Sequence, residues 1–339
     1  MNILNNKSVL VTGGTGSFGK KFIELALKKF KLKKLIVFSR DEQKQIQLQQ
    51  NPKYKSKCMR YFIGDVRDLD RLCTAMDGVD IVIHAAALKH VPVAEYNPFE
   101  VVKTNILGAQ NIIEACMKTK VKKVIALSTD KASSPINLYG ATKLTSDKLF
   151  VGANYYKGSK NIKFSVVRYG NVMGSRGSVI PFFINQRKNG FLSVTNKQMT
   201  RFNITLDKGS EFVLFCLKKM WGGEVFVPKI PSYRIMDLAK AIAPKNKVKV
   251  TGIRPGEKLH EEMISTSEAL NTVEFDKYFA ILPNAEFIGW NKKKYLKLNK
   301  TGKICSNNFS YNSETNSKFL TISEIRNLLK YNLSDIHLY

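Results

Sequence analysis

The sequence predicts an α/β protein in which a doubly wound parallel sheet is joined to a smaller C-terminal lobe. Short apolar runs alternate with segments of helical periodicity through the first half of the chain. The first of these runs ends in a glycine-rich turn. Past about residue 170 the alternation stops, and Gly, Pro and aromatic residues interrupt the pattern. We therefore assign residues 1–170 to the first domain, completed by segments after residue 200, and residues 171–339 mainly to the lobe, with a polar tail after Asn284.

The apolar runs predict strands, and their continuity predicts that the sheet is buried on both faces. The runs lie at residues 8–13, 34–39, 79–87, 122–129 and 164–174, and helical spacing marks residues 20–30 and 106–118. Right-handed crossovers between such strands give a doubly wound topology. Near the C-terminus, Thr321 and Glu324 match a capping box, which predicts one more helix.

The charge of the chain is strongly positive. Lys and Arg number 55 against 27 Asp and Glu, which gives a formal net charge of +28 over 339 residues. The basic residues are mostly lysines spread along the chain, whereas a nucleic-acid surface usually concentrates arginine in one stripe. We expect no nucleic-acid partner, and we interpret the excess as solvated lysine that also attracts an anionic substrate.

Cysteine usage and hydropathy predict a cytoplasmic protein. The five cysteines are scattered with no C-x-x-C pair, which predicts neither a metal site nor a disulfide framework and suits a reducing compartment. No apolar run approaches the ~20 residues that a membrane span needs. The glycine-rich turn already begins at Gly13, which leaves no room for a signal peptide before it.

The glycine-rich turn predicts a dinucleotide site of the Rossmann type. Gly13, Gly16 and Gly19 lie three residues apart, directly after a strand and before a helix. Glycine permits a tight turn and lets backbone N–H groups approach a pyrophosphate, whose charge the helix N-terminus favours. A bare structural turn is the alternative.

The end of the second strand predicts which dinucleotide is bound. Ser39 and Arg40 come first, and Asp41 follows. A cation at this place suits the 2′-phosphate of NADP, whereas an acid suits the ribose hydroxyls of NAD. We favour NADP; the alternative is a solvated or adenine-stacked Arg40, with Asp41 holding the ribose of NAD. After the third strand, Asp65 is expected to accept from the adenine amino group, unless it simply caps the next helix.

Tyr139 and Lys143 form a Y-x-x-x-K pair and therefore lie on one face of a helix. The charge of the lysine is expected to lower the pKa of the tyrosine, so that a phenolate takes a hydroxyl proton as hydride leaves for a nicotinamide. The pattern is specific here because it follows a strand that ends in Ser128 and Thr129.

Seven contiguous stretches carry a resemblance that covers essentially the whole chain. They are TGGTGSFG, FSRDE, HAAALKHVPVAEYNP, STDKASSPINLYGATK, GNVMGSRGSVIPFF, MTRFNIT and IRPGEKLHEEM. In these stretches the chain resembles the extended short-chain dehydrogenase/reductase superfamily, and within it the inverting UDP-N-acetylglucosamine 4,6-dehydratases of pseudaminic acid synthesis. Retaining relatives carry Asp-Glu where this chain has Asp130 and Lys131, so Lys131 indicates inversion. A membrane-anchored branch replaces the tyrosine by methionine, whereas this chain keeps Tyr139.

The resemblance implies the reaction and the roles of its residues. Tyr139 deprotonates the sugar C4 hydroxyl while NADP takes the C4 hydride. Lys131 is implied as the base at C5 and Asp130 as the acid at C6, so that water leaves before the hydride returns to C6. A buried, ion-paired lysine is expected to have a pKa low enough for base work. The alternatives are a helix-capping Asp130 and an ordinary surface Lys131.

The remaining site residues follow from the motifs and the resemblance together. The cofactor positions are Gly13, Thr15, Gly16, Ser17, Phe18, Gly19, Ser39, Arg40, Asp41, Lys44, Asp65, Val66, Ala85, Ala86, Ala87, Lys89, Asn105, Tyr139 and Lys143. The substrate positions are Lys89, Thr129, Asn171, Ser178, Val179, Pro181, Arg201, Arg254 and Glu257. We expect at least one of the two arginines to bind the UDP diphosphate, with structural ion pairs as the alternative.

The remaining expectations concern two single residues, the assembly and the rival functions. Lys89 contacts cofactor or substrate, or is simply a loop lysine, and His84 is expected to pack at a strand end. The resemblance implies a homo-oligomer, a hexamer, that acts on UDP-N-acetylglucosamine. The rival functions are a retaining dehydratase or C4 epimerase of a UDP-sugar, and an inactive regulator that binds nucleotide or nucleic acid.

Overall fold

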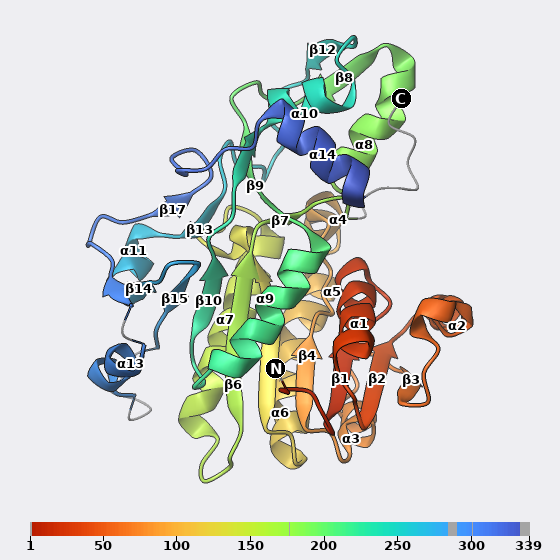
Figure 1. Ribbon diagram of the computed structural model, residues 1–339, viewed down its shortest axis with the longest axis vertical. Helices are drawn as coiled ribbons and strands as arrows, with labels where there is room; N and C mark the ends of the chain where they lie inside the picture. The colour runs from red at the N-terminus through yellow and green to blue at the C-terminus, as the bar shows by residue number, and fades with distance from the viewer. Residues whose placement is uncertain (1, 176, 284–289, 300, 333–339) are drawn as a thin grey trace.

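A long mixed sheet forms the centre of the molecule. The computed structural model describes residues 2–175, 177–283, 290–299 and 301–332, so the start of the polar tail at 284–289 lies outside the described residues. Within them a 10-stranded sheet has the order β16-β14-β15-β10-β6-β5-β4-β1-β2-β3 (Figure 1). Its parallel strands are β1 (Ser8–Thr12), β2 (Lys34–Ser39), β3 (Met59–Ile63), β4 (Ile81–His84), β5 (Lys123–Thr129), β6 (Lys163–Tyr169) and β10 (Val225–Pro228).

The strand order reverses between β1 and β4, which is the switch point of a doubly wound sheet. Every residue of β1 and β4 is buried, as their continuous apolar sequences predict. The predicted doubly wound α/β class is therefore confirmed. The switch point matters for function because ligands of such sheets bind at the carboxyl ends of the strands beside it.

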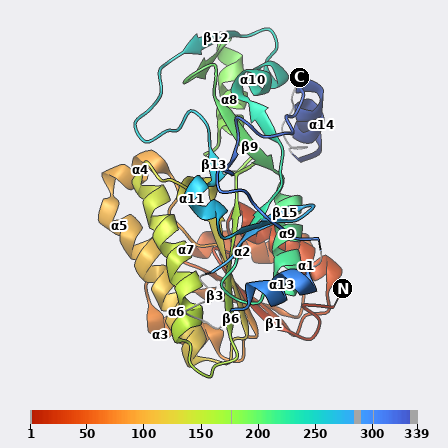
Figure 2. The same cartoon turned by 90° about the vertical axis from the view of Figure 1, so that its left-hand side faces the viewer.

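Helices cover both faces of the sheet, as Figure 2 shows edge-on. One face carries α1 (Ser17–Lys29) and α9 (Leu206–Lys219), which pack against each other. The other carries α3 (Leu69–Met76), α6 (Gly108–Lys118) and α7 (Leu138–Tyr156). The helix predicted over 106–118 begins as a π-helical turn, η2 (Lys103–Leu107), that leads into α6.

Segments from the second half of the chain extend the sheet. β15 (Tyr278–Ile281) pairs antiparallel with β10, β14 (Thr272–Glu274) with β15, and β16 (Lys303–Ile304) with β14. Several shorter helices lie around this framework. They are α2 (Glu42–Gln50), η1 (Pro52–Tyr54), α4 (Val91–Tyr96), α5 (Pro98–Val102), η3 (Asp130–Ala132), α11 (Thr266–Ala269) and α13 (Lys292–Leu298).

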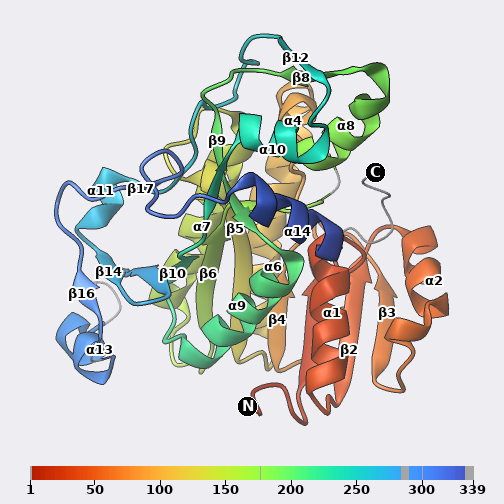
Figure 3. The ribbon, with the colours of Figure 1, turned by 45° about the horizontal axis from the view of Figure 1, so that its top comes forward.

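A smaller lobe lies over the carboxyl ends of the parallel strands (Figure 3). It contains the sheet β11-β9-β7, the pair β12-β8 and the helices α8, α10 and α14. The bounds are β7 (Asn171–Val172), α8 (Val179–Gln186), η4 (Arg187–Asn189), β8 (Phe191–Val194), β9 (Thr200–Ile204), β11 (Ser232–Arg234), α10 (Ile235–Ile242), β12 (Lys247–Val250) and α14 (Ile322–Asn332). The lobe has its own core, in which Phe183, Leu238 and Leu329 are buried together.

Two local features order the C-terminal segment. β13 (Glu262–Ile264) pairs antiparallel with β17 (Tyr311–Asn312). At the start of α14 the hydroxyl of Thr321 accepts the N–H of Glu324 at 3.2 Å, and the Glu324 carboxylate accepts the N–H of Thr321 at 2.9 Å. The predicted capping box is confirmed.

Candidate active site

The positions predicted for the cofactor come together because parallel strands end at the same edge of the sheet. The glycine turn follows β1, Ser39 to Asp41 follow β2, Asp65 follows β3 and the alanines at 85–87 follow β4. Tyr139 and Lys143 reach the same edge from α7. The topology therefore gathers segments that are far apart in the sequence.

The glycine turn has no room for side chains. Gly13 has a φ of +64°, and a Cβ placed on it would lie 3.0 Å from the carbonyl of Ala85. A Cβ on Gly19 would lie 2.5 Å from Cα of Gly14. The N-cap of α1 is Gly16, which provides no side-chain hydrogen bond, so the first N–H groups of the helix stay available to an anion. This cradle fits the pyrophosphate of a dinucleotide.

His84 holds the β4 end of this cradle. Its buried Nδ1 lies 2.9 Å from the hydroxyl oxygen of Thr12, and the same oxygen accepts the N–H of Ala85 at 3.1 Å. Burial, helped by the charge of Lys143, lowers the pKa of His84 to about 3. The geometry agrees with the expected packing role, because a neutral imidazole tied to the turn is held in place.

After β2, the side chain of Asp41 is engaged in hydrogen bonds, whereas most of the Arg40 side chain is exposed. The side chain of Asp41 caps α2, where it accepts the N–H of Lys44 at 2.9 Å and also pairs with the ammonium of Lys44. Arg40 keeps 53% of its side chain exposed and reaches Asp65 only at 3.5 Å. The cation is thus the freer group at the predicted 2′ position.

Asp65 is held by Arg67. Its carboxylate accepts from Nε and Nη2 of Arg67 at 3.0 and 2.8 Å. Burial raises the pKa of Asp65, but these hydrogen bonds outweigh burial and hold the pKa below its ordinary value. The alternative in which Asp65 caps the next helix is wrong, because the side chain of Asp68 caps α3 by accepting the N–H of Arg71.

Asn105 fixes the loop after β4. Its side chain accepts the N–H of Leu88 and donates to the carbonyl of Leu88, both at 2.9 Å, and it also donates to the hydroxyl of Thr142 on α7 at 3.1 Å. The loop that carries Lys89 is thereby tied to the helix that carries Tyr139. Partial burial and the nearby charge of Lys131 lower the pKa of Lys89.

Tyr139 and Lys143 lie one turn apart on α7, and both are buried. Burial raises the pKa of Tyr139 to about 12, and the cation that opposes this rise is Lys131. Burial lowers the pKa of Lys143, which the carboxylate of Asp147 opposes. The expectation that Lys143 lowers the pKa of the tyrosine is therefore wrong for the chain by itself, because desolvation of the phenolate outweighs the nearby cations.

Lys131 lies between two carboxylates. Its Nζ is 3.1 Å from Oδ1 of Asp130 and 3.0 Å from Oε1 of Glu261, and 3.4 Å from Oδ1 of Asn171 on β7. Asp130 is completely buried, and the turn that it opens is capped by the side chain of Thr129. Both alternatives for the pair are wrong: Asp130 is not the cap, and Lys131 is not an ordinary surface lysine.

The pKa values of this pair differ from the expectation. Burial raises the pKa of Asp130 despite the charge of Lys131. Burial lowers the pKa of Lys131, but Asp130 and Glu261 outweigh burial and raise that pKa above its ordinary value. The prediction of a lowered lysine pKa is thus wrong for the free chain, because a second carboxylate that we did not assign contacts the amine.

Arg201 is a structural arginine in this geometry. Its Nη1 donates to the carbonyl of Leu259 and its Nη2 to the carbonyl of Lys258, both at 2.9 Å, and its Nε lies 3.6 Å from Oε1 of Glu261. These contacts correct the assignment of Arg201 as a diphosphate ligand, since its donors are already used. Arg254 is exposed, so it is the remaining candidate of the two.

Several buried oxygens near the substrate positions have no hydrogen-bond partner among the described residues. They are Oδ2 of Asp130, Oγ of Ser178, Oε2 of Glu257 and Oε2 of Glu261. Buried polar atoms are normally paired, so unpaired oxygens here suit a polar ligand. Val179 and Pro181 lie in the first turn of α8, beside Ser178, and residue Arg176 of the same loop lies outside the described residues.

The geometry agrees with what the comparisons found. Residues 9–283 match the family described as Polysaccharide biosynthesis protein. The UDP-N-acetylglucosamine 4,6-dehydratase (inverting) of Campylobacter jejuni is 52% identical over 332 residues, which cover 97% of this chain and 99% of that protein.

The chain belongs to the polysaccharide biosynthesis protein family. A second relative, the UDP-glucose 4-epimerase of Rickettsia bellii, is 40% identical over 96% of this chain and 95% of that protein. Among solved structures, Pen from Bacillus thuringiensis has a TM-score of 0.88 and 40% identity, and covers 97% of this chain and 99% of its own. The resemblance stated from the sequence motifs is confirmed.

Three buried residues that the sequence analysis missed complete the site of this family member. Glu261 lies in the stretch IRPGEKLHEEM, so the motif itself was the signal that could have found it. One turn after Lys143, Asp147 accepts the hydroxyl of Ser128 at 2.7 Å and lies 3.4 Å from Nη2 of Arg168. The spacing of Asp147 from Lys143 was its signal, whereas only the fold brings Arg168 to it.

No helix in the described part of the chain combines the length and apolar character needed to cross a membrane.

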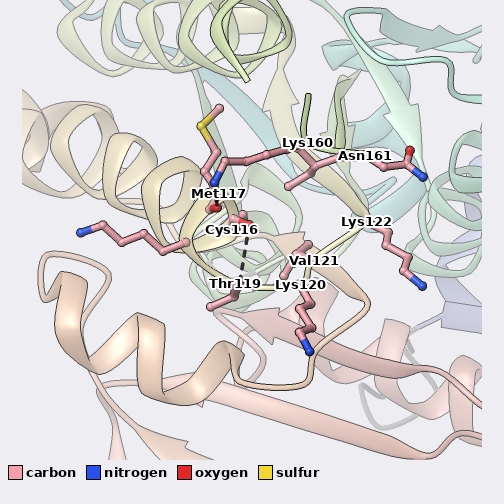
Figure 4. A pocket seen from close by; sticks show the side chains of 10 residues that line it. Cys116, Met117, Thr119, Lys120, Val121, Lys122, Lys160 and Asn161 are labelled. Carbon is pink, nitrogen blue, oxygen red and sulfur yellow. Dashed lines mark hydrogen bonds between the residues drawn. The ribbon is translucent and has the colours of Figure 1, made fainter. Parts of the chain in front are cut away.

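A pocket of about 340 Å³ opens at the amino ends of β5 and β6, where Lys118, Lys120, Lys122 and Lys160 are among its lining residues (Figure 4). It contains none of the predicted site residues, since those lie at the opposite edge of the sheet.

Proposed function

We propose that this chain dehydrates UDP-N-acetylglucosamine at C4 and C6 with inversion at C5, giving UDP-2-acetamido-2,6-dideoxy-β-L-arabino-hex-4-ulose. The observation that carries the proposal is the contact of Lys131 with buried Asp130 at 3.1 Å, beside Tyr139. Oxidation at C4 needs only the tyrosine and its lysine, whereas loss of water from C5 and C6 needs a further base and acid. The Campylobacter jejuni relative of that name supports the same reading.

The turn at Gly13 to Gly19 supports a nicotinamide dinucleotide as cofactor, and we propose NADP. Arg40 is the exposed cation at the 2′ position, while Asp41 is engaged with the start of α2. When bound, the nicotinamide would supply the hydride chemistry, which is uptake of hydride from C4 and its return to C6.

The residues of the chain then divide the proton transfers between them. Tyr139 takes the proton of the C4 hydroxyl, and the resulting ketone makes the C5 hydrogen acidic. Lys131, as a neutral amine, takes the C5 proton, and Asp130 gives its proton to the C6 hydroxyl, which leaves as water. A proton that comes from solvent is delivered to C5 from the opposite face, which inverts that carbon. Thr129 connects the two centres, since it hydrogen-bonds both Tyr139 and Asp130.

The test is turnover of UDP-N-acetylglucosamine in D₂O followed by proton NMR. A new C6 methyl signal, deuterium at C5 and an L-configured ring are expected. A methyl signal on a D-configured ring would mean a retaining dehydratase. A C4 epimer without a methyl signal would favour the second candidate, a C4 epimerase, which the relative from Rickettsia bellii supports by its name.

The proposal extends to the setting of the reaction. The five cysteines are free, which suits a reducing compartment, and we place the chain in the cytoplasm. By resemblance the product is the first intermediate toward pseudaminic acid for flagellin glycosylation, and the chain forms a homo-oligomer, a hexamer. We further propose that residues 1–170 with β10 bind the cofactor and that the lobe binds the sugar nucleotide. Light scattering after size-exclusion chromatography tests the assembly.

A further inference from the structure

Two acids compete for one lysine at the centre of the site. Lys131 Nζ lies 3.1 Å from Asp130 and 3.0 Å from Glu261. Asp130 is adjacent in sequence, whereas Glu261 comes from the segment just before β13 and is 2% exposed. The proposed dehydration requires a neutral Lys131 and a protonated acid, so the choice between the two carboxyl groups decides which of them becomes the acid.

The surroundings of the two carboxylates differ. Glu261 lies 3.6 Å from Nε of Arg201, whose own position is fixed by the carbonyls of Leu259 and Lys258. Besides the contact with Lys131, the Asp130 carboxylate accepts the neutral hydroxyl of Thr129 at 3.0 Å. A permanently charged arginine favours an ionised Glu261. Complete burial favours a protonated Asp130, whose carboxylate contacts no cation other than Lys131 among the described residues.

We propose that Glu261 is a positioning residue for the dehydration step. Its carboxylate, kept ionised by Arg201, holds the amine of Lys131 against Asp130 and leaves Asp130 as the acid that receives the proton of Lys131. This inference rests on the proposed function, and it adds a residue and a direction of proton transfer to it.

The charges of the two cations and two carboxyl groups at this site sum to zero both before and after the proton transfer. In the resting state Arg201 and Lys131 are cationic while Asp130 and Glu261 are anionic, which sums to zero. Transfer of one proton from Nζ of Lys131 to the Asp130 carboxylate neutralises both groups and leaves the Arg201–Glu261 pair unchanged, so the sum is again zero. The transfer therefore moves no net charge into or out of the buried site. Moving a net charge there would cost free energy.

The acids also differ in the direction of their pKa shifts, as an assigned acid and a permanent counter-ion should. Burial raises the pKa of Asp130 despite Lys131. Burial also raises the pKa of Glu261, but Lys131 and Arg201 outweigh it and hold that pKa below its ordinary value. The other titratable or charged groups that interact with Lys131 are Lys89, Tyr139, Tyr233 and Lys258.

The test compares Glu261→Gln and Glu261→Asp with the wild type, with Glu314→Gln as a matched control on an exposed acid. Steady-state dehydration is measured across pH together with KM, and folding is checked by thermal melting. For Glu261→Gln we expect a kcat loss of about 100-fold with little change in KM. Removing the anion lowers the pKa of Lys131, so the alkaline limb of the pH profile should move down by about one pH unit or more.

Glu261→Asp keeps the charge but shortens its reach, so kcat should fall about tenfold while the alkaline limb stays in place. A wild-type kcat and pH profile in Glu261→Gln would overturn the inference. So would a raised KM with kcat unchanged, which would make Glu261 a substrate ligand. If Glu261→Gln does not fold, Glu261→Asp tests the inference instead, and an unchanged kcat in that variant would overturn it. The inference would also be overturned if the alkaline limb of the wild-type pH profile lay far below 10.5, the ordinary pKa of lysine.

Failure of the proposed function looks different. A wild-type chain that produces no C6 methyl signal fails as a dehydratase, whatever the variants do. A wild-type chain that dehydrates, with variants that behave like it, removes only the role of Glu261.

Discussion

The amine of Lys131 lies 3.1 Å from the carboxylate of Asp130, in a turn that begins directly after β5. Both residues belong to the short helical turn η3, from which Lys131 also reaches Asn171 on β7 and Glu261 just before β13. The pair lies next to Tyr139 rather than on the surface. The groups that we propose for oxidation and for dehydration are therefore parts of one site.

Replacing Lys131 by alanine should separate the two halves of the proposed reaction. We expect loss of the C6 methyl product by about 10²- to 10⁴-fold, because the C5 base is removed. Oxidation at C4 should persist, since Tyr139 and Lys143 remain, and reduced cofactor should accumulate on the enzyme. Absorbance of the reduced nicotinamide and proton NMR measure the two steps. The control is Lys122→Ala, an exposed lysine far from the site, and equal loss of both steps would contradict the separation.

Tyr139 should resist deprotonation in the cofactor-free chain. Burial disfavours the charged phenolate and raises its pKa from 10.0 to about 12, so the group stays protonated at pH values where an ordinary exposed tyrosine, with a pKa of about 10, already titrates. NMR of ring-labelled tyrosine, with Tyr139→Phe to assign the signal, follows the titration. A midpoint for Tyr139 at or below about 10 would contradict the prediction.

Arg40→Ser should change the cofactor preference. If the guanidinium binds the 2′-phosphate, its loss should weaken NADP binding about 10- to 100-fold and leave NAD binding nearly unchanged. Titration calorimetry with both dinucleotides measures this, and Arg60→Ser, which changes an exposed arginine of β3, is the control. Equal weakening of both dinucleotides would mean that Arg40 contacts the adenine instead.

Arg168 should be essential for stability. Its fully buried guanidinium lies 3.4 Å from Asp147 and 2.9 Å from Glu268, so Arg168→Met removes the contacting cation from the buried Asp147 carboxylate and leaves it only the nearby charge of Lys143. We expect a loss of about 3–5 kcal/mol in the free energy of unfolding. Urea denaturation compares it with Arg234→Met, an exposed arginine whose removal should cost about 0.5 kcal/mol or less. Equal midpoints would contradict the prediction.

Gly19→Ala should damage the cofactor cradle. The new Cβ would lie 2.5 Å from Cα of Gly14, so the turn has to move away from its present path. Dinucleotide binding should weaken by about 10-fold or more, since backbone N–H groups lose their alignment. Gly152→Ala in α7 is the matched control: nothing lies within 4 Å of its Cβ, and alanine should raise helix stability by about 0.5–1 kcal/mol. Unchanged dinucleotide affinity in Gly19→Ala would contradict a close approach.

The sequence alone was enough for the fold class and the family. Periodicity marks β1, β2 and β5 because buried parallel strands need continuous apolar residues, and glycine marks the turn after β1 because no other residue fits it. These requirements are local, so the identities of neighbouring residues in the sequence are enough to predict them. The motif that holds Asp130, Lys131 and Tyr139 could be read for the same reason.

The ionisation of the site depended on the tertiary structure. We expected a lowered pKa for both Tyr139 and Lys131, and both are raised. Desolvation of the phenolate raises the pKa of Tyr139, whereas the carboxylates of Asp130 and of the distant Glu261 together outweigh desolvation of the Lys131 ammonium and raise its pKa. Arg201 likewise changes from an expected phosphate ligand to a structural arginine once the carbonyls of Leu259 and Lys258 fold around it. The sequence determined which groups the protein possesses, and only the fold decided which of them meet and how deeply they are buried. Electrostatic energies depend on distance and solvent exposure rather than on order along the chain.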